Sequence, residues 1–136
     1  MSVVEQLIVK DENTLSFGNY KLDTKTKLKD FEFKGDLYKI KTFYEITKLE
    51  KNGLFVYESV PGTAVHNFDA AGDRVSFEVE GKSDAQITLE LEESTEYDVT
   101  IGNQDAGVMR TNLGGKLILS VELEEDKPLK VVIVKK

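Results

Sequence analysis

The chain has 136 residues, a formal net charge of −7 at pH 7, 40% hydrophobic and 32% charged residues, and no cysteine. A chain of this length and composition can bury a hydrophobic core without cross-links, which excludes a disordered protein. The lack of cysteine excludes disulfides and thiolate metal sites. The acidic balance and the lack of a long apolar run argue against nucleic acid or a membrane as partner. Because no secretory signal is visible at the start, we expect a cytoplasmic protein, with non-classical export as the alternative.

Turn residues divide the chain into short apolar runs, many of which alternate with polar residues at the two-residue period of a half-buried strand. We predict about ten or eleven strands from twelve runs, some of which would merge or fail: 3–9, 14–20, 30–34, 37–49, 54–60, 64–69, 74–80, 85–91, 96–101, 107–111, 116–123 and 129–134. Residues 21–30 lack a period and are predicted to form a loop or one helical turn. The pattern predicts an all-β protein, an antiparallel β-sandwich with a barrel as the alternative. We expect one domain, 1–136, with any subdivision near 61–63 or 81–84.

Asn52-Gly53 is predicted to form the type I′ turn of a hairpin between residues 37–49 and 54–60. Aromatic residues concentrate in this hairpin, and in a continuous strand register Tyr44 and Tyr57 lie on the same face. Core packing is one interpretation of these rings, and a glycan or other ligand surface is the other. Tyr44 and Tyr57 are therefore candidate ligand-binding residues.

His66 is the sole histidine, and Arg74 is one of two arginines. His66 is either packed within a strand or a ligand contact, and we retain both His66 and Arg74 as ligand-binding candidates. One histidine and no cysteine leave no conventional zinc site, and no EF-hand spacing is present. No nucleophilic triad, P-loop or dinucleotide motif occurs. We therefore predict no metal, no cofactor and no catalytic residue.

Charge is unevenly distributed along the chain. Residues 21–51 carry nine lysines and six acidic groups, whereas residues 69–126 carry four basic and fifteen acidic groups. This asymmetry is either a solvated acidic surface on the C-terminal half or a dipole that helps subunits meet. The runs at 3–9 and 129–134 are apolar on both faces, so they are either central strands or the contact of a homo-oligomer.

Leu91, Thr95 and Tyr97 have the spacing of the tyrosine corner and resemble that motif of fibronectin-III and immunoglobulin-like sandwiches. This resemblance implies that Tyr97 is buried with its hydroxyl bonded to the preceding turn.

Residues 35–68 and 111–117 resemble small proteins of anaerobic Gram-positive bacteria that often carry an endosialidase label. That label implies an enzyme acting on glycans. Sialidases clamp the substrate carboxylate with an arginine cluster, and this chain has Arg74 and Arg110 alone, so no catalytic residue is carried over.

The sequence thus favours a non-catalytic β-sandwich with a structural, self-assembling or adaptor role. A carbohydrate- or small-ligand-binding module is the alternative, followed by an endosialidase-like enzyme. The expected partners are a second copy, through the terminal strands, or a glycan.

Overall fold

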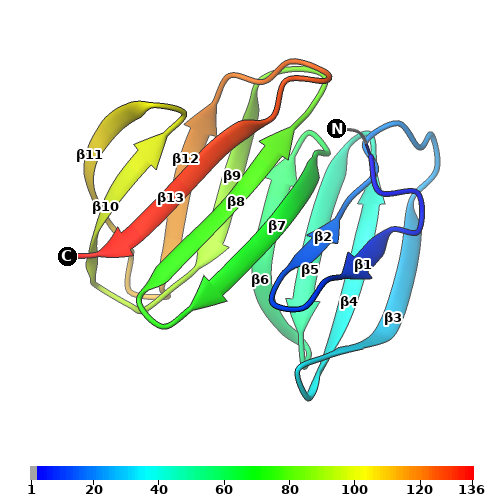
Figure 1. Cartoon of the computed structure of the whole chain (residues 1–136), viewed down its shortest axis with the longest axis horizontal. Coiled ribbons are helices and arrows are strands. Elements are labelled where there is room, and N and C mark those ends of the chain that lie inside the picture. Colours follow the sequence, from blue (N-terminus) through cyan, green and yellow to red (C-terminus); the bar gives the residue numbers. More distant parts are fainter. Residues whose placement is uncertain (1–2) are drawn as a thin grey trace.

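A computed structural model describes residues 3–136 as thirteen β-strands in two antiparallel sheets (Figure 1). The first sheet has the order β1 (Ile8–Lys10), β2 (Leu15–Phe17), β7 (Ala64–Ala71), β8 (Arg74–Glu80), β13 (Leu129–Lys135), β10 (Glu96–Ile101) and β11 (Gln104–Arg110). The second has the order β12 (Lys116–Val121), β9 (Ala85–Glu90), β6 (Leu54–Val60), β5 (Ile46–Lys51), β4 (Asp36–Phe43) and β3 (Thr26–Phe33). The sheets do not close into a barrel, so the predicted antiparallel β-sandwich is confirmed. Residues 3–136 contain no helix that could cross a membrane.

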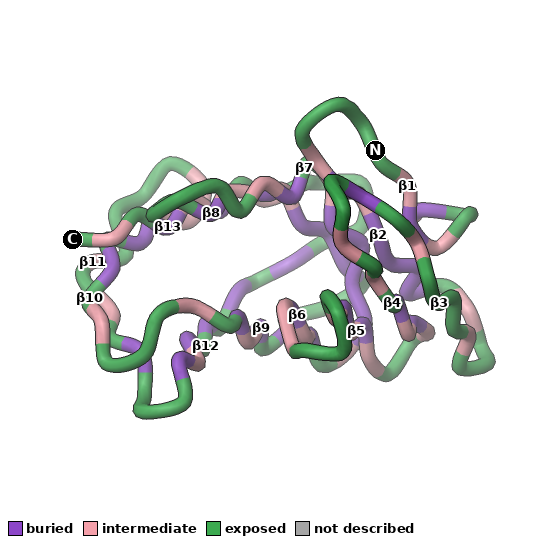
Figure 2. The backbone as a smooth tube through the Cα atoms, turned by 90° about the horizontal axis from the view of Figure 1, so that it is seen from below, coloured by how far each residue is buried: buried purple, intermediate pink, exposed green. Residues whose placement is uncertain are grey.

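The core lies between the two sheets. Figure 2 shows the two layers with buried residues along both of them. Alternation explains this placement in β8, where Val75, Phe77 and Val79 are buried as predicted. The same period holds in β9 and β12. Four rings from both sheets meet edge to face or tilted at the centre: Phe17, Tyr57, Phe68 and Phe77.

Three predicted elements differ from the structure. The run at 3–9 forms a strand only from Ile8 on, in β1, because a turn that ends with positive φ at Leu7 precedes it. The run at 37–49 is two strands, because the chain turns at Tyr44 and Glu45 between β4 and β5. This turn was missed because it contains none of the residues that mark turns, Gly, Pro, Asn or Asp. The prediction of a loop or helical turn at 21–30 is wrong from residue 26 on, where β3 begins. β3 is an edge strand whose residues 26–30 are mostly exposed, so only its end, within the predicted run 30–34, has an apolar pattern.

The Asn52-Gly53 turn joins β5 to β6, and both residues have positive φ, 52° and 81°, as a type I′ turn requires. The predicted common face of Tyr44 and Tyr57 is wrong. Tyr57 is fully buried, whereas Tyr44 is 53% exposed in the β4–β5 turn. The additional turn removes Tyr44 from the strand face. The register shift between Leu49 and Glu50 leaves Tyr57 on the buried face, together with Ile40 and Leu49.

The two terminal strands have different positions. β13 lies between β8 and β10, so both of its backbone edges are paired. β1 is an edge strand of three residues. On β13, Val131 and Ile133 face the core, and Val134 remains 39% exposed. A homo-oligomer formed through these strands stays a prediction. At β13 a second copy would have to pack on the face of the sheet, because no backbone edge is open for an added strand.

Candidate functional site

One end of the sandwich carries a pocket of about 700 Å³. This volume lies within the range of small-molecule sites. The lining residues are mostly polar or charged: Tyr20, Lys21, Asp23, Tyr44, Pro61, Gly62, Lys82, Ser83 and Glu125.

The pocket is made by loops that pass from one sheet to the other. The β2–β3, β6–β7, β8–β9 and β12–β13 connections all contribute lining residues, and the β4–β5 turn adds Tyr44. Residues far apart in sequence therefore meet at one end of a rigid scaffold. Loops held in this way are where binding residues of β-sandwiches concentrate.

Tyr44 is held in place by its backbone while its ring stays accessible. Its N–H donates to the Leu22 carbonyl and its own carbonyl accepts from the Gly62 N–H, both at 3.0 Å. The ring packs edge to face on Phe43 at 5.3 Å between centroids. The nearby Glu45 carboxylate raises the pKa of the Tyr44 phenol further above physiological pH, where a tyrosine hydroxyl is already protonated. The outcome is a fixed, half-exposed aromatic surface at the pocket.

A buried hydroxyl network supports the wall of the pocket that precedes Thr63. Thr47 Oγ1 donates to the Thr63 carbonyl at 2.9 Å and lies 2.8 Å from Thr42 Oγ1. Because the single hydroxyl proton of Thr47 is used, Thr42 is the donor of that second bond. Tyr57 OH and Ser59 Oγ each lie 2.8 Å from Thr63 Oγ1. All five side chains are buried, so the network fixes this wall to the core.

A second buried group, the carboxylate of Glu80, joins two more lining loops. Glu80 is fully buried, and its Oε2 accepts from Tyr20 OH and from the Asp126 N–H, each at 3.1 Å. Its Oε1 has no hydrogen-bond partner within residues 3–136. Burial and the negative charge of Glu80 raise the pKa of Tyr20 far above its ordinary value. Tyr20 therefore stays protonated and ties the β2–β3 connection to the end of β8.

The rim of the pocket carries charges of both signs. Lys21 Nζ lies 4.0 Å from Glu125 Oε2, with both side chains partly exposed. Lys82, Ser83 and Asp23 complete the polar lining. Ammonium, hydroxyl and carboxylate groups together can donate and accept hydrogen bonds to a polar, uncharged ligand.

The structure does not bring the four predicted ligand residues together. Tyr44 lines the pocket, whereas Tyr57 is inside the core with its hydroxyl on Thr63. His66 is half-buried on β7 opposite Glu78. Arg74 lies at the β7–β8 turn, the far end of β7 from Pro61 and Gly62, and lines a separate hollow with Asp69, Ala71 and Ser76.

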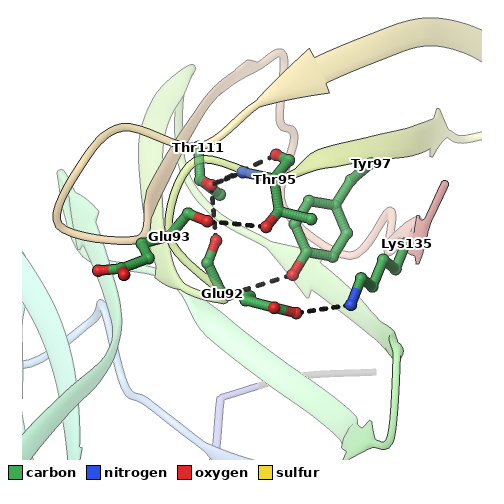
Figure 3. Close-up of polar contacts among 6 residues, drawn as sticks. All are labelled: Glu92, Glu93, Thr95, Tyr97, Thr111 and Lys135. Atoms are coloured by element: carbon green, nitrogen blue, oxygen red, sulfur yellow. Dashed lines mark hydrogen bonds and ion pairs between the residues drawn. The ribbon is translucent and has the colours of Figure 1, made fainter.

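The tyrosine corner lies at the β9–β10 connection, at the other end of β9 from the pocket loop that carries Lys82 and Ser83. Figure 3 shows its polar contacts. Tyr97 is buried, and its hydroxyl accepts the Glu92 N–H at 3.1 Å, as the motif implied. Thr111 Oγ1 donates to the Glu92 carbonyl at 2.6 Å, and Lys135 Nζ lies 2.8 Å from Glu92 Oε2. These contacts fix the β9–β10 connection to β11 and β13. The corner is therefore a folding element and lies apart from the candidate site.

Neither protein-family models nor curated proteins nor solved structures give a match to this chain. The assignment of function therefore rests on the chemistry of the pocket.

Proposed function

We propose that this protein is a non-catalytic module that binds a carbohydrate in the pocket at the Tyr44 end of the sandwich. The observation that carries the proposal is a pocket of about 700 Å³, lined mostly by polar and charged residues, to which Tyr44 contributes an exposed aromatic ring.

The chemistry of the lining suits a sugar. A pyranose presents C–H bonds on one face and hydroxyl groups at its edge. The Tyr44 ring offers an apolar surface for the first, and Lys82, Ser83 and Asp23 offer donors and acceptors for the second.

The supporting networks favour binding as well. A preformed site avoids much of the entropy cost of ordering loops when a ligand arrives. Here the hydroxyl network around Thr63 and the bonds of Glu80 to Tyr20 and to the Asp126 N–H hold three of the lining loops before any ligand is present.

The absence of a paired nucleophile favours a non-catalytic role. Ser83 is the lining serine, and the sole histidine, His66, does not line the pocket, so this hydroxyl has no imidazole base there. The two arginines also lie apart, because Arg74 on β8 and Arg110 on β11 are three strands, roughly 14 Å, from each other. We expect no release of reducing ends from polysialic acid, and release that depends on Arg74 or Arg110 would contradict a binding module.

Titration calorimetry against a panel of neutral and acidic oligosaccharides tests the proposal. We expect at least one member to bind, with affinity about tenfold or more weaker for Tyr44→Ala, because the stacking surface is lost. Tyr44→Phe keeps the ring and should keep most of the affinity. Leu54→Ala is the matched control, since Leu54 is 72% exposed at the far end of the β5–β6 hairpin. Equal binding by Tyr44→Ala and Leu54→Ala would refute the site.

A further inference from the structure

A row of lysines crosses the outer face of the six-stranded sheet. Lys27 on β3 lies directly opposite Lys41 on β4, and Lys41 lies directly opposite Lys48 on β5. Lys39 is two residues from Lys41 on the same strand and therefore on the same face. These four lysines and Glu50 line a hollow of about 120 Å³.

Two of the cross-strand pairs in this group are unfavourable for the protein alone, Lys27 with Lys41 and Lys41 with Lys48. In contrast, Lys39 lies opposite Glu50, and Lys48 lies opposite Glu58. Like charges directly opposite each other on antiparallel strands repel and destabilise the sheet. Burial, together with the positive charges of Lys25, Lys48 and Lys27, lowers the pKa of Lys41, although the nearby carboxylate of Glu58 acts in the opposite direction. Lys48 has an ion pair with Glu50 at 3.9 Å, but Lys27, Lys39 and Lys41 make none within residues 3–136. The hollow therefore keeps an excess of positive charge.

Protection of a sheet edge does not explain the row. Lysine on an edge strand prevents pairing with other chains, and this accounts for Lys27 on β3. β4 and β5 are interior strands, paired on both sides, so Lys41 and Lys48 protect no edge.

We propose that this hollow binds a multiply charged oxyanion, the phosphate or sulfate group of a ligand. Ammonium groups bind phosphate as point charges, and several of them around one hollow share the charge of the anion. The net charge of −7 does not prevent this, because at physiological salt charges beyond about 8 Å are largely screened. The site lies outside the Tyr44 pocket and does not depend on it.

The first test is titration calorimetry with inorganic phosphate, inorganic sulfate and glucose 6-phosphate, in chloride buffer of matched ionic strength. We expect saturable binding in the wild type and about tenfold or more weaker binding in Lys41→Gln. Lys29→Gln is the matched control. It also removes one positive charge, but Lys29 is on β3 and does not line the hollow. Tighter binding of glucose 6-phosphate than of phosphate would identify a sugar ester as the source, and equal binding would identify the free ion.

Thermal unfolding gives a second test, because Lys41→Gln should be the more stable protein in chloride, whereas phosphate should stabilise the wild type alone. In chloride buffer Lys41→Gln should unfold at a higher temperature than the wild type, because repulsion within the row is relieved. In phosphate the wild type should gain stability and Lys41→Gln should not. Identical responses of Lys41→Gln and Lys29→Gln would overturn the proposal, as would equal effects of phosphate and chloride. Self-association that Lys41→Gln abolishes, without any effect of these anions, would overturn it too, because the acidic half of a second chain would then be the occupant. Tyr44→Ala should bind phosphate normally, which separates this site from the pocket.

Discussion

Among single side chains, Glu80 shows how a buried charge is used in this fold. Its carboxylate is fully enclosed and accepts hydrogen bonds on Oε2 alone, within residues 3–136. Burying a carboxylate is costly unless donors compensate it, so Glu80 is weak as a stabilising group. Its two donors come from the β2–β3 and β12–β13 connections, and both of these loops line the pocket. We infer that Glu80 contributes chiefly to the position of these loops.

Tyr97→Phe tests the tyrosine corner. The substitution removes the acceptor of the Glu92 N–H while the ring stays in the core. We expect the free energy of unfolding to fall by about 0.5–1.5 kcal/mol in chemical denaturation. Tyr44→Phe is the control, since its hydroxyl is in an exposed side chain and its loss should change stability by less than about 0.5 kcal/mol. Equal stability of Tyr97→Phe and the wild type would refute the structural role of this bond.

The buried tyrosines predict a loss of stability in alkali. Burial raises the pKa of Tyr57 well above its ordinary value of 10.0, so its hydroxyl keeps its proton in the folded state. Above pH 10 the unfolded chain binds fewer protons than the native one at this position, and stability must fall as pH rises. Tyr57→Phe should be less stable near pH 8, because its bond to Thr63 is lost, but should decline less steeply between pH 9 and 11. Urea unfolding at several pH values measures this. Parallel declines in the stability of the wild type and Tyr57→Phe would contradict the assignment.

Among the strands and turns, prediction succeeded where a local rule decides the conformation. The alternation of β8, β9 and β12 and the Asn52-Gly53 turn follow from adjacent residues, and the structure confirms them. Only the end of β3 was found in this way, within the predicted run 30–34, because residues 26–30 are mostly exposed and are stabilised by pairing with β4 rather than by their own pattern. The β4–β5 turn was not predicted, for the related reason that Tyr44 and Glu45 have no turn preference of their own.

Gly53→Ala tests the hairpin turn. Gly53 has a φ of 81°, and a Cβ there would meet no atom within 4 Å, so the cost arises from the backbone conformation alone. We expect a loss of about 1 kcal/mol in chemical denaturation. Gly114→Ala is the matched control, because Gly114 does not have a left-handed φ and its Cβ would lie 3.4 Å from the Asn112 side chain. An equal effect of the two substitutions would refute the type I′ assignment.

In the assembled sandwich, the site depends on sheet order, which the sequence patterns do not specify. The turn signals at Pro61-Gly62 and near residues 81–84 correctly located two of the lining loops. These loops meet Tyr20 and Glu125 because four connections cross between the sheets at the same end of the sandwich. Of the predicted ligand residues, Tyr44 alone lines this pocket. The sequence patterns did not predict the lysine row either, because Lys27, Lys41 and Lys48 become neighbours only through the register of β3, β4 and β5.

The most direct measurement is mapping of backbone amide chemical shifts in ¹⁵N-labelled protein during titration with the oligosaccharide panel. The binding proposal predicts that the shifts that change belong to residues 20–23, 44–45, 62, 82–83 and 125, the loops around one end of the sandwich. These changes should be absent in Tyr44→Ala and unaltered in Lys41→Gln. Changes confined to other parts of the chain, or no change with any member of the panel at millimolar concentration, would contradict the proposal that this pocket binds carbohydrate.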